Sequence, residues 1–189
     1  MKITNDYPGL TRSKKGYYIM NGDLISEEGI DIELDASLVV TGSIKAKYGI
    51  KAGDGIEAGC GIKAGWDIEV GDKIESGWGI KAGGRIKAGW DIEAVGGIEA
   101  GRDIEAGGGI KAGFDITACG GIKAGFGITA GGGIKAGAYI DCGKRIFTGT
   151  SVCDDENSCK KTIKCAELRN GTVAYGDLVI TKQEVTHED

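Results

Sequence analysis

The chain has 189 residues, a length typical of one domain, and a net charge of −5 with both signs well mixed, which argues against a basic nucleic-acid binder. Glycine is the anomaly, at 36 residues, yet the single proline, Pro8, excludes collagen. The apolar share of 41% and the regular spacing of isoleucine argue against disorder.

Residues 1–31 carry the signals of an N-terminal β cap. The apolar run 17–20 is followed by Asn21-Gly22 and then by a second run, 23–25. Asn-Gly between two apolar runs is typical of a β-hairpin. We therefore expect a hairpin here that covers the open edge of the following repeat.

Residues 32–154 form the repeat. Isoleucine recurs at every sixth position from Ile44 to Ile146, eighteen times without an insertion, and Ile32, Leu38 and Val152 extend the phase. The residue two places after each isoleucine is alanine in fourteen of the eighteen units, and the next residue is glycine in fifteen. The unit is therefore Ile-x-Ala-Gly-x-x.

This unit predicts one short strand and one corner. Residues two apart share a face of an extended strand, so isoleucine and alanine point inward and the residue between them points outward. Glycine is expected to permit the bend. A period of six does not fit an α-helix, in which each glycine would also cost about 1 kcal/mol.

The outward charges favour a triangular coil of 18 residues. Stacked coils bring residues i and i+18 side by side, and opposite charges there stabilise a sheet. On one face the signs then alternate through about seven coils: Glu33, Lys51, Glu69, Lys87, Glu105, Lys123 and Asp141. The sequence therefore predicts an all-β, triangular parallel β-helix, capped at both ends.

Residues 155–189 are expected to form a C-terminal β-hairpin cap or a dimerisation element. Strands are predicted at 162–168 and 172–181, with a turn at Asn170-Gly171. A homodimer through this segment is one expectation.

Two families of hexapeptide repeat bear on the handedness. Hexapeptide acyltransferases, which are left-handed, carry a small residue two places before the aliphatic one, whereas this chain has large or polar residues such as Tyr48, Asp54 and Trp66 there. Bactofilin-like helices are right-handed and triangular. Handedness is left open, with a slight preference for the right-handed form.

A closer resemblance is to the Gly-Gly-Tyr-Ile-Lys-Ala-Gly arrays of phage and prophage proteins. It is carried by the run 61–69, Gly-Ile-Lys-Ala-Gly-Trp-Asp-Ile-Glu, and by the endings 145–147 and 173–179. The resemblance covers most of the chain. It implies a phage-borne accessory protein in the host cytoplasm, with inhibition of a host defence complex (anti-CRISPR-like) as its role.

Catalytic and metal chemistry find little support in the sequence. The only histidine, His187, lies three residues from the end of the printed chain, so an acyltransferase would lack its base. Cys153, Cys159 and Cys165 are spaced six apart, unlike the close pairs of zinc sites, and Cys142 replaces an inward alanine. We expect no enzyme, no cofactor and no metal.

Membrane and export signals are also missing from the sequence. The first six residues lack the apolar run of a signal peptide, and no stretch approaches the length of a membrane span. Six cysteines without an export signal indicate reduced thiols. We therefore expect a cytoplasmic protein that does not associate with membranes.

Two charged stripes and three tryptophans are candidate binding groups. Glu57, Glu75 and Glu93 stack on a second face, flanked by Asp54, Asp72 and Asp91. Lys45, Lys63 and Lys81 stack on the third face as a second candidate stripe. Trp66, Trp78 and Trp90 occupy corners, where packing over a neighbouring glycine and exposure as an interface hot spot are both open.

These groups predict a rigid binding protein that does not catalyse a reaction. Stacked like charges cost stability, so a charged docking stripe is set against a merely solvated surface. The partner is expected to be a protein, such as a nucleic-acid-binding host defence complex whose phosphate site the carboxylates mimic. The alternative is a self-assembling, bactofilin-like scaffold.

Overall fold

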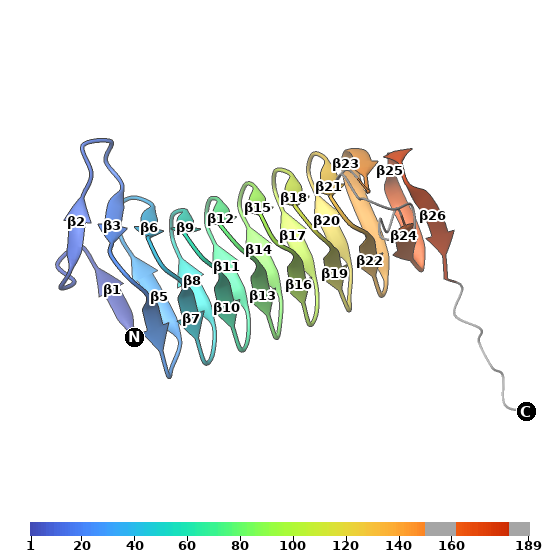
Figure 1. The fold of residues 1–189 in the computed structure, drawn as a ribbon. Helices are drawn as coiled ribbons and strands as arrows, with labels where there is room; N and C mark the ends of the chain where they lie inside the picture. Colours follow the sequence, from blue (N-terminus) through green and yellow to red (C-terminus); the bar gives the residue numbers. More distant parts are fainter. Residues whose placement is uncertain (150–161, 182–189) are drawn as a thin grey trace, which may run out of the picture.

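The computed structural model describes residues 1–149 and 162–181, which form a rod of 26 strands (Figure 1). No helix occurs among these residues. In the regular part each strand pairs in parallel with the third strand after it, so that successive strands lie on three faces. About eight turns of about 18 residues stack along the rod. The predicted triangular parallel β-helix is confirmed.

The three faces are named by the strands that build them. The mixed face contains β1 (Lys2–Thr4), β5 (Ile30–Glu33), β8 (Ile50–Ala52), β11 (Ile68–Val70), β14 (Ile86–Ala88), β17 (Ile104–Ala106), β20 (Ile122–Ala124), and the first halves of β23 (Tyr139–Phe147) and β25 (Glu167–Tyr175). The acidic face contains β2 (Leu10–Arg12), β3 (Tyr18–Met20), β6 (Leu38–Val40), β9 (Ile56–Ala58), β12 (Ile74–Ser76), β15 (Ile92–Ala94), β18 (Ile110–Ala112), β21 (Ile128–Ala130), and the second halves of β23 and β25. The lysine face contains β4 (Leu24–Ser26), β7 (Ile44–Ala46), β10 (Ile62–Ala64), β13 (Ile80–Ala82), β16 (Ile98–Ala100), β19 (Ile116–Ala118), β22 (Ile134–Ala136), β24 (Thr162–Cys165) and β26 (Asp177–Ile180).

The core is the stack of inward isoleucines and small residues. Each isoleucine from β7 to β23 lies beside the isoleucine 18 residues away, as Ile62 lies beside Ile80, and all eighteen are buried. Departures from alanine are also buried, including Ser76, whose hydroxyl donates to the Cys60 carbonyl oxygen at 2.7 Å. Burying each isoleucine contributes roughly 1.5–3 kcal/mol before chain entropy is counted.

The repeat glycines serve a purpose other than the one expected. None of the glycines that directly follow Ile-x-Ala has a positive φ. Instead, a Cβ on Gly83 would overlap the carbonyl oxygen of Gly65, one coil earlier, and Gly101 stands in the same relation to Gly83. Glycine is therefore needed because consecutive coils approach closely at the corner. The structure offers no explanation for Val95, which occupies the same position.

A second glycine position is matched to an aspartate. The Asp91 carboxylate accepts the backbone N–H of Gly109 at 2.6 Å, and a Cβ on the adjacent Gly108 would overlap that carboxylate. The same arrangement recurs three more times, at Asp67 with Gly84, Asp103 with Gly120, and Asp115 with Gly132. These aspartates tie each corner to the corner of the next coil.

The N-terminal segment departs from prediction. β3 and β4 lie on different faces and pair in parallel with β6 and β7, so the hairpin expected at Asn21-Gly22 is wrong. Gly22 has φ +87° and forms a corner of the solenoid. The antiparallel pair in this region is β2 with β3, joined through Gly16, whose φ is +98°.

The register in this first coil is 20 residues, because two extra residues separate β5 from the regular repeat. Asp31, not Glu33, therefore lies beside Lys51, and Ile30, not Ile32, takes the isoleucine position. Glu33 instead pairs with Lys2 at 2.8 Å. The alternation of charge along the mixed face is preserved with Asp31 as its first member.

The C-terminal segment also continues the solenoid. β24 pairs in parallel with β22 and β26, and β25 pairs in parallel with β23, so the predicted hairpin at Asn170-Gly171 is wrong. Gly171, at φ +106°, lies where β25 turns from the mixed face to the acidic face. Val152, Cys153 and Cys159 lie outside the described residues.

Candidate protein-interaction surface

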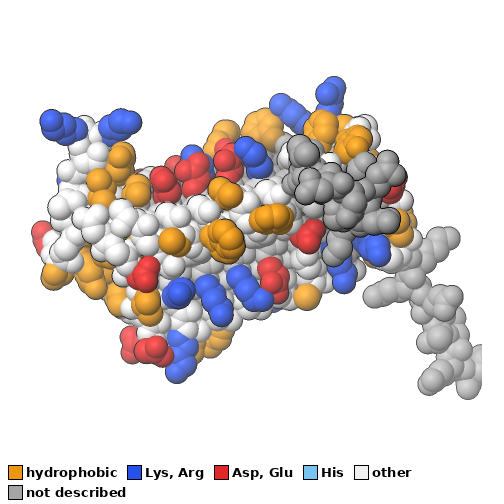
Figure 2. Space-filling view, viewed as in Figure 1, with side chains coloured by type: hydrophobic (Ala, Val, Ile, Leu, Met, Phe, Trp, Pro, Cys, Tyr) orange, Lys and Arg blue, Asp and Glu red, His pale blue; other side chains and the backbone are white. Residues whose placement is uncertain are grey.

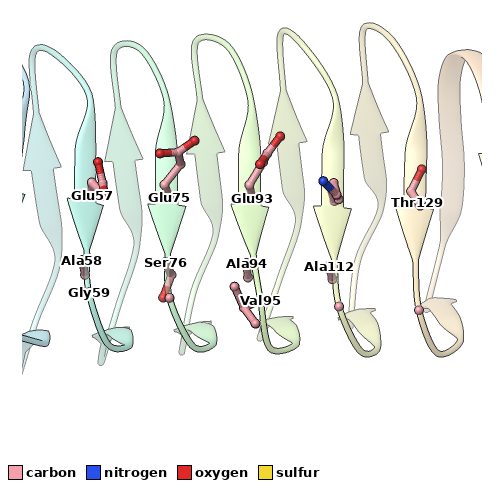
Figure 3. Close-up of a pocket in the computed structure, with 14 residues that line it drawn as sticks. Glu57, Ala58, Gly59, Glu75, Ser76, Glu93, Ala94, Val95, Ala112 and Thr129 are labelled. Carbon is pink, nitrogen blue, oxygen red and sulfur yellow. The ribbon is translucent and has the colours of Figure 1, made fainter. Parts of the chain in front are cut away.

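The three predicted glutamates form a ladder on the acidic face. Glu57 on β9, Glu75 on β12 and Glu93 on β15 lie directly beside one another in the parallel register. Their carboxylates point to the same side of the sheet (Figure 3). Parallel strands are ~4.8 Å apart, so three like charges occupy one short row. Lys111 and Thr129 continue the row on the next two strands.

The ladder borders two shallow grooves. One, of about 450 Å³, runs beside the glutamates toward the lysine face and includes Ser76 and Val95 (Figure 3). The other, of about 650 Å³, runs toward the mixed face and includes Asp54, Asp72 and Lys73. Both are open to solvent along the rod, so they suit an extended surface of a partner better than an enclosed small molecule.

Only one glutamate of the ladder is neutralised by a nearby cation. Lys73 donates a hydrogen bond to Glu75, and that bond is the main reason why the pKa of the Lys73 ammonium is raised. Within the part of the chain that the structure describes, Glu57 and Glu93 form no ion pair. Figure 2 shows acidic side chains gathered in a row on one side of the rod, separate from a row of basic ones.

The flanking aspartates differ from one another. Asp54 accepts the Ser37 hydroxyl at 2.9 Å and the Gly55 N–H at 2.8 Å, and Asp91 accepts the Gly109 N–H. Both carboxylates therefore hold corners in place, a role that was not predicted. Asp72 is exposed and remains available to a partner.

The three tryptophans lie on three different edges of the rod. Trp90 follows Asp72 on the edge between the mixed and acidic faces, and Trp78 follows Cys60 on the edge between the acidic and lysine faces. Trp66 follows Tyr48 on the edge between the lysine and mixed faces. Trp66 therefore cannot share one binding surface with the glutamates, whereas Trp78 and Trp90 border the acidic face on its two sides.

The tryptophans are partly packed and largely exposed. Their exposed fractions are 63% for Trp66, 70% for Trp78 and 50% for Trp90. Trp66 contacts Tyr48 with ring centroids 4.7 Å apart, and Trp90 contacts Phe126 with centroids 5.8 Å apart. Both interpretations left open by the sequence thus apply: the rings pack along the edges and still present apolar area to solvent.

The second candidate stripe is also assembled as predicted. Lys45, Lys63 and Lys81 lie side by side on the lysine face, and Trp78 lines the same groove of about 500 Å³. Lys81 contacts both carboxylate oxygens of Glu99 at 2.8 Å. One end of this stripe is therefore neutralised, as one member of the glutamate ladder is.

The described cysteines do not gather at a metal site. Cys142 is buried and donates to the Phe126 carbonyl oxygen at 3.0 Å, as expected for a core thiol. Cys165 also points inward and is fully buried, which corrects the expectation that it would point outward. Burial raises the pKa of both thiols. No cluster of three metal-ligating side chains occurs in residues 1–149 and 162–181.

The same residues contain no helix long and apolar enough to cross a membrane.

Comparison with protein-family models, with curated proteins and with solved structures found no match. The functional argument therefore depends on the geometry of the faces and edges.

Two groups at the acidic face were missed from the sequence. Val95 is 66% exposed and lines the groove beside Glu93, and Phe114 is exposed on the same edge as Trp78. The signal for Val95 was available, because it replaces the glycine of the repeat. Both add apolar contact area beside the carboxylates.

Proposed function

We propose that the chain is a non-catalytic binding protein whose acidic face docks on a basic surface of a protein partner. The observation that carries the proposal is the ladder of Glu57, Glu75 and Glu93. Directly opposed like charges destabilise a sheet. The mixed face of the same rod alternates its charges, so the repeat accommodates the favourable arrangement where nothing else is required. A partner that supplies cations would compensate for the cost.

The surroundings of the ladder support a protein partner. Exposed apolar side chains, Trp78, Trp90 and Val95, border the carboxylates. Charged groups accelerate association, and buried aromatic side chains supply most of the affinity in protein interfaces. A rigid rod also loses little conformational entropy on binding.

We further propose that the partner is a host defence complex that binds nucleic acid, and that the chain is a phage-encoded, anti-CRISPR-like inhibitor. The resemblance to phage repeat arrays and the row of carboxylates both favour this assignment. Carboxylates ~4.8 Å apart are closer than the phosphates of one nucleic-acid strand. Partial competition with nucleic acid is therefore expected, rather than full mimicry.

The test compares two matched sets of substitutions. The triple variant Glu57→Gln, Glu75→Gln, Glu93→Gln removes three charges from the acidic face. The control variant removes three charges elsewhere, at Glu69, Glu99 and Glu105. Each is assayed by plating phage on a CRISPR-carrying host that expresses the chain, and by pull-down of purified CRISPR effector complexes at increasing salt. The first variant should lose protection and binding, while the control should retain both.

A tryptophan pair provides an independent control. Trp90→Ala should weaken binding by about 2 kcal/mol, as expected for an interface hot spot. Trp66→Ala, on the edge opposite the acidic face, should leave binding unchanged. Equal behaviour of the two triple variants would refute the acidic face as the site and would direct attention to the stripe of Lys45, Lys63 and Lys81. A parent chain that gives phage no protection would refute the defence-inhibitor assignment.

The alternative, a self-assembling scaffold, is favoured by one observation. The last coil of the rod leaves apolar side chains exposed at its end, including Leu178 and Ile180. Assembly into long filaments would need both ends to accept a neighbour.

A further inference from the structure

The two ends of the rod are finished differently. At the N-terminal end β1 stacks on β5, and Ile3 is fully buried beneath its surroundings. The amino group of Met1 donates to the Gly29 carbonyl oxygen at 2.7 Å, and Tyr7 and Leu10 pack against the core. The chain thus closes its own first coil.

The C-terminal end is open. Leu178 and Ile180 on β26 lie beside Ile163 and Cys165 of β24, which are fully buried core residues. Leu178 and Ile180 therefore hold core positions, yet they are 40% and 44% exposed. β26 pairs with β24 on one side, and no strand in the described ranges pairs with its other side (Figure 1).

We propose that this end is the interface of a homodimer in which two rods meet tail to tail. An open β edge has unpaired N–H and C=O groups that attract another strand. The exposed core positions would be buried by a surface with the same triangular section. A second copy of this end has that section and the same apolar residues. The closed N-terminal end does not, so a head-to-tail filament is excluded.

Symmetry makes the match specific. A two-fold axis that is perpendicular to the rod and passes through the lysine face superposes the two triangular sections. It maps the lysine face onto itself, exchanges the mixed and acidic faces, and reverses the strand direction. β26 would then lie antiparallel to the β26 strand of the second copy. An isologous interface of this kind closes on itself and yields dimers only.

The register follows from the side chains. Residues directly opposite each other in an antiparallel pair point to the same side of the sheet. If Val179 lies on the axis, Leu178 faces the second copy's Ile180, and both pairs point into the shared core. Asp177 then faces Thr181, so no like charges meet along this strand. The contact is limited to one end of the rod, which predicts a weak, reversible dimer.

Sedimentation velocity of the full chain over a hundredfold range of concentration tests the proposal. The parent should shift from monomer to dimer as concentration rises, with no larger species. The double variant Leu178→Lys, Ile180→Lys should stay monomeric, because dimerisation would bury unpaired charges and should weaken it ~10-fold or more. Ile25→Lys is the control, since Ile25 is exposed on the lysine face near the other end.

Val179→Lys provides a second variant whose side chain points outward and leaves the core unchanged. It would place two ammonium groups at the axis and should also weaken the dimer. Circular dichroism at low concentration should show that all variants fold as the parent does. A parent that is monomeric at every concentration, filaments, or a dimer unaffected by both β26 variants would overturn the proposal.

Discussion

Replacement of Gly108 by alanine tests the corner arrangement directly. A methyl group at Gly108 would overlap the Asp91 carboxylate, which accepts the Gly109 N–H at 2.6 Å, and would lie 3.1 Å from the Trp90 carbonyl carbon. The methyl can fit only if the carboxylate moves away. The variant then loses a charge-assisted hydrogen bond, which is worth about 1.5–3 kcal/mol. We expect the free energy of unfolding to fall by about 2–3 kcal/mol in urea titrations.

A double-mutant cycle separates this mechanism from a general intolerance of alanine. Asp91→Ala removes the overlapping carboxylate, so the further change Gly108→Ala should cost about 1 kcal/mol or less, with a coupling energy of about 1–2 kcal/mol. Gly53→Ala is the matched control, because a Cβ there meets nothing within 4 Å. It should be neutral or stabilise by about 0.4–1 kcal/mol. Additive effects, or equal stability of Gly108→Ala and Gly53→Ala, would refute the reasoning.

Three further predictions concern the core, the first coil and the thiols. Ile92→Asp places an unpaired charge at a fully buried position and should cost several kcal/mol, so a variant with the parent's thermal midpoint would contradict the inward stack. The hydroxyl of Tyr18 donates to Asp35 at 2.8 Å and is the main reason why the pKa of that carboxyl is lowered. A lowered pKa contributes stability above the ordinary value near 3.8 that is lost as pH falls through the folded value. In Tyr18→Phe, NMR titration should therefore find Asp35 protonating at higher pH, and an unchanged midpoint would count against the contact. The exposed thiol of Cys60 should react quickly with an alkylating reagent, whereas Cys142 should react only after unfolding, as peptide mass mapping can establish.

The interior and the stacking register could be predicted because they repeat. Eighteen isoleucines at one spacing reinforce one another, and the charge alternation on the mixed face identified the 18-residue coil. The glycine of the unit was located correctly, but its reason was not. Bend and close approach both demand glycine, and only the position of the preceding coil, as at Gly65 below Gly83, distinguishes the two.

The two hairpin predictions failed for one physical reason. Asn21-Gly22 and Asn170-Gly171 do contain glycines with positive φ, as the turn signal implies. A corner of the solenoid needs the same backbone conformation as a tight hairpin. The choice between them is made by the neighbouring coil, which offers a complete parallel ladder to β4 and β25. That ladder is tertiary, so the local sequence does not reveal it.

The candidate site was predicted in part. The glutamate ladder follows from the register alone, and it was found. The tryptophans were grouped together because they are equally spaced in the chain. A spacing of twelve residues in a coil of 18 moves two faces forward, however, so Trp66, Trp78 and Trp90 must fall on different edges. The hydrogen bonds of Asp54 and Asp91 depend on corner geometry that no residue pattern had indicated.

The corner residues also determine how many sides the rod has. The isoleucine and alanine interior would suit coils of 12, 18 or 24 residues equally well. Beneath the corner aspartates, a coil of 12 would replace glycine by Trp78, Arg102, Phe114 and Phe126. A coil of 24 would again place large side chains there, at Trp90, Phe114 and Phe126. Large and glycine corners alternate from one hexad to the next, and only an odd number of hexads per coil stacks each large residue on a glycine. Loss or duplication of a single coil would reverse that alternation at the junction, so this rod can change its length without a clash only by two coils at a time.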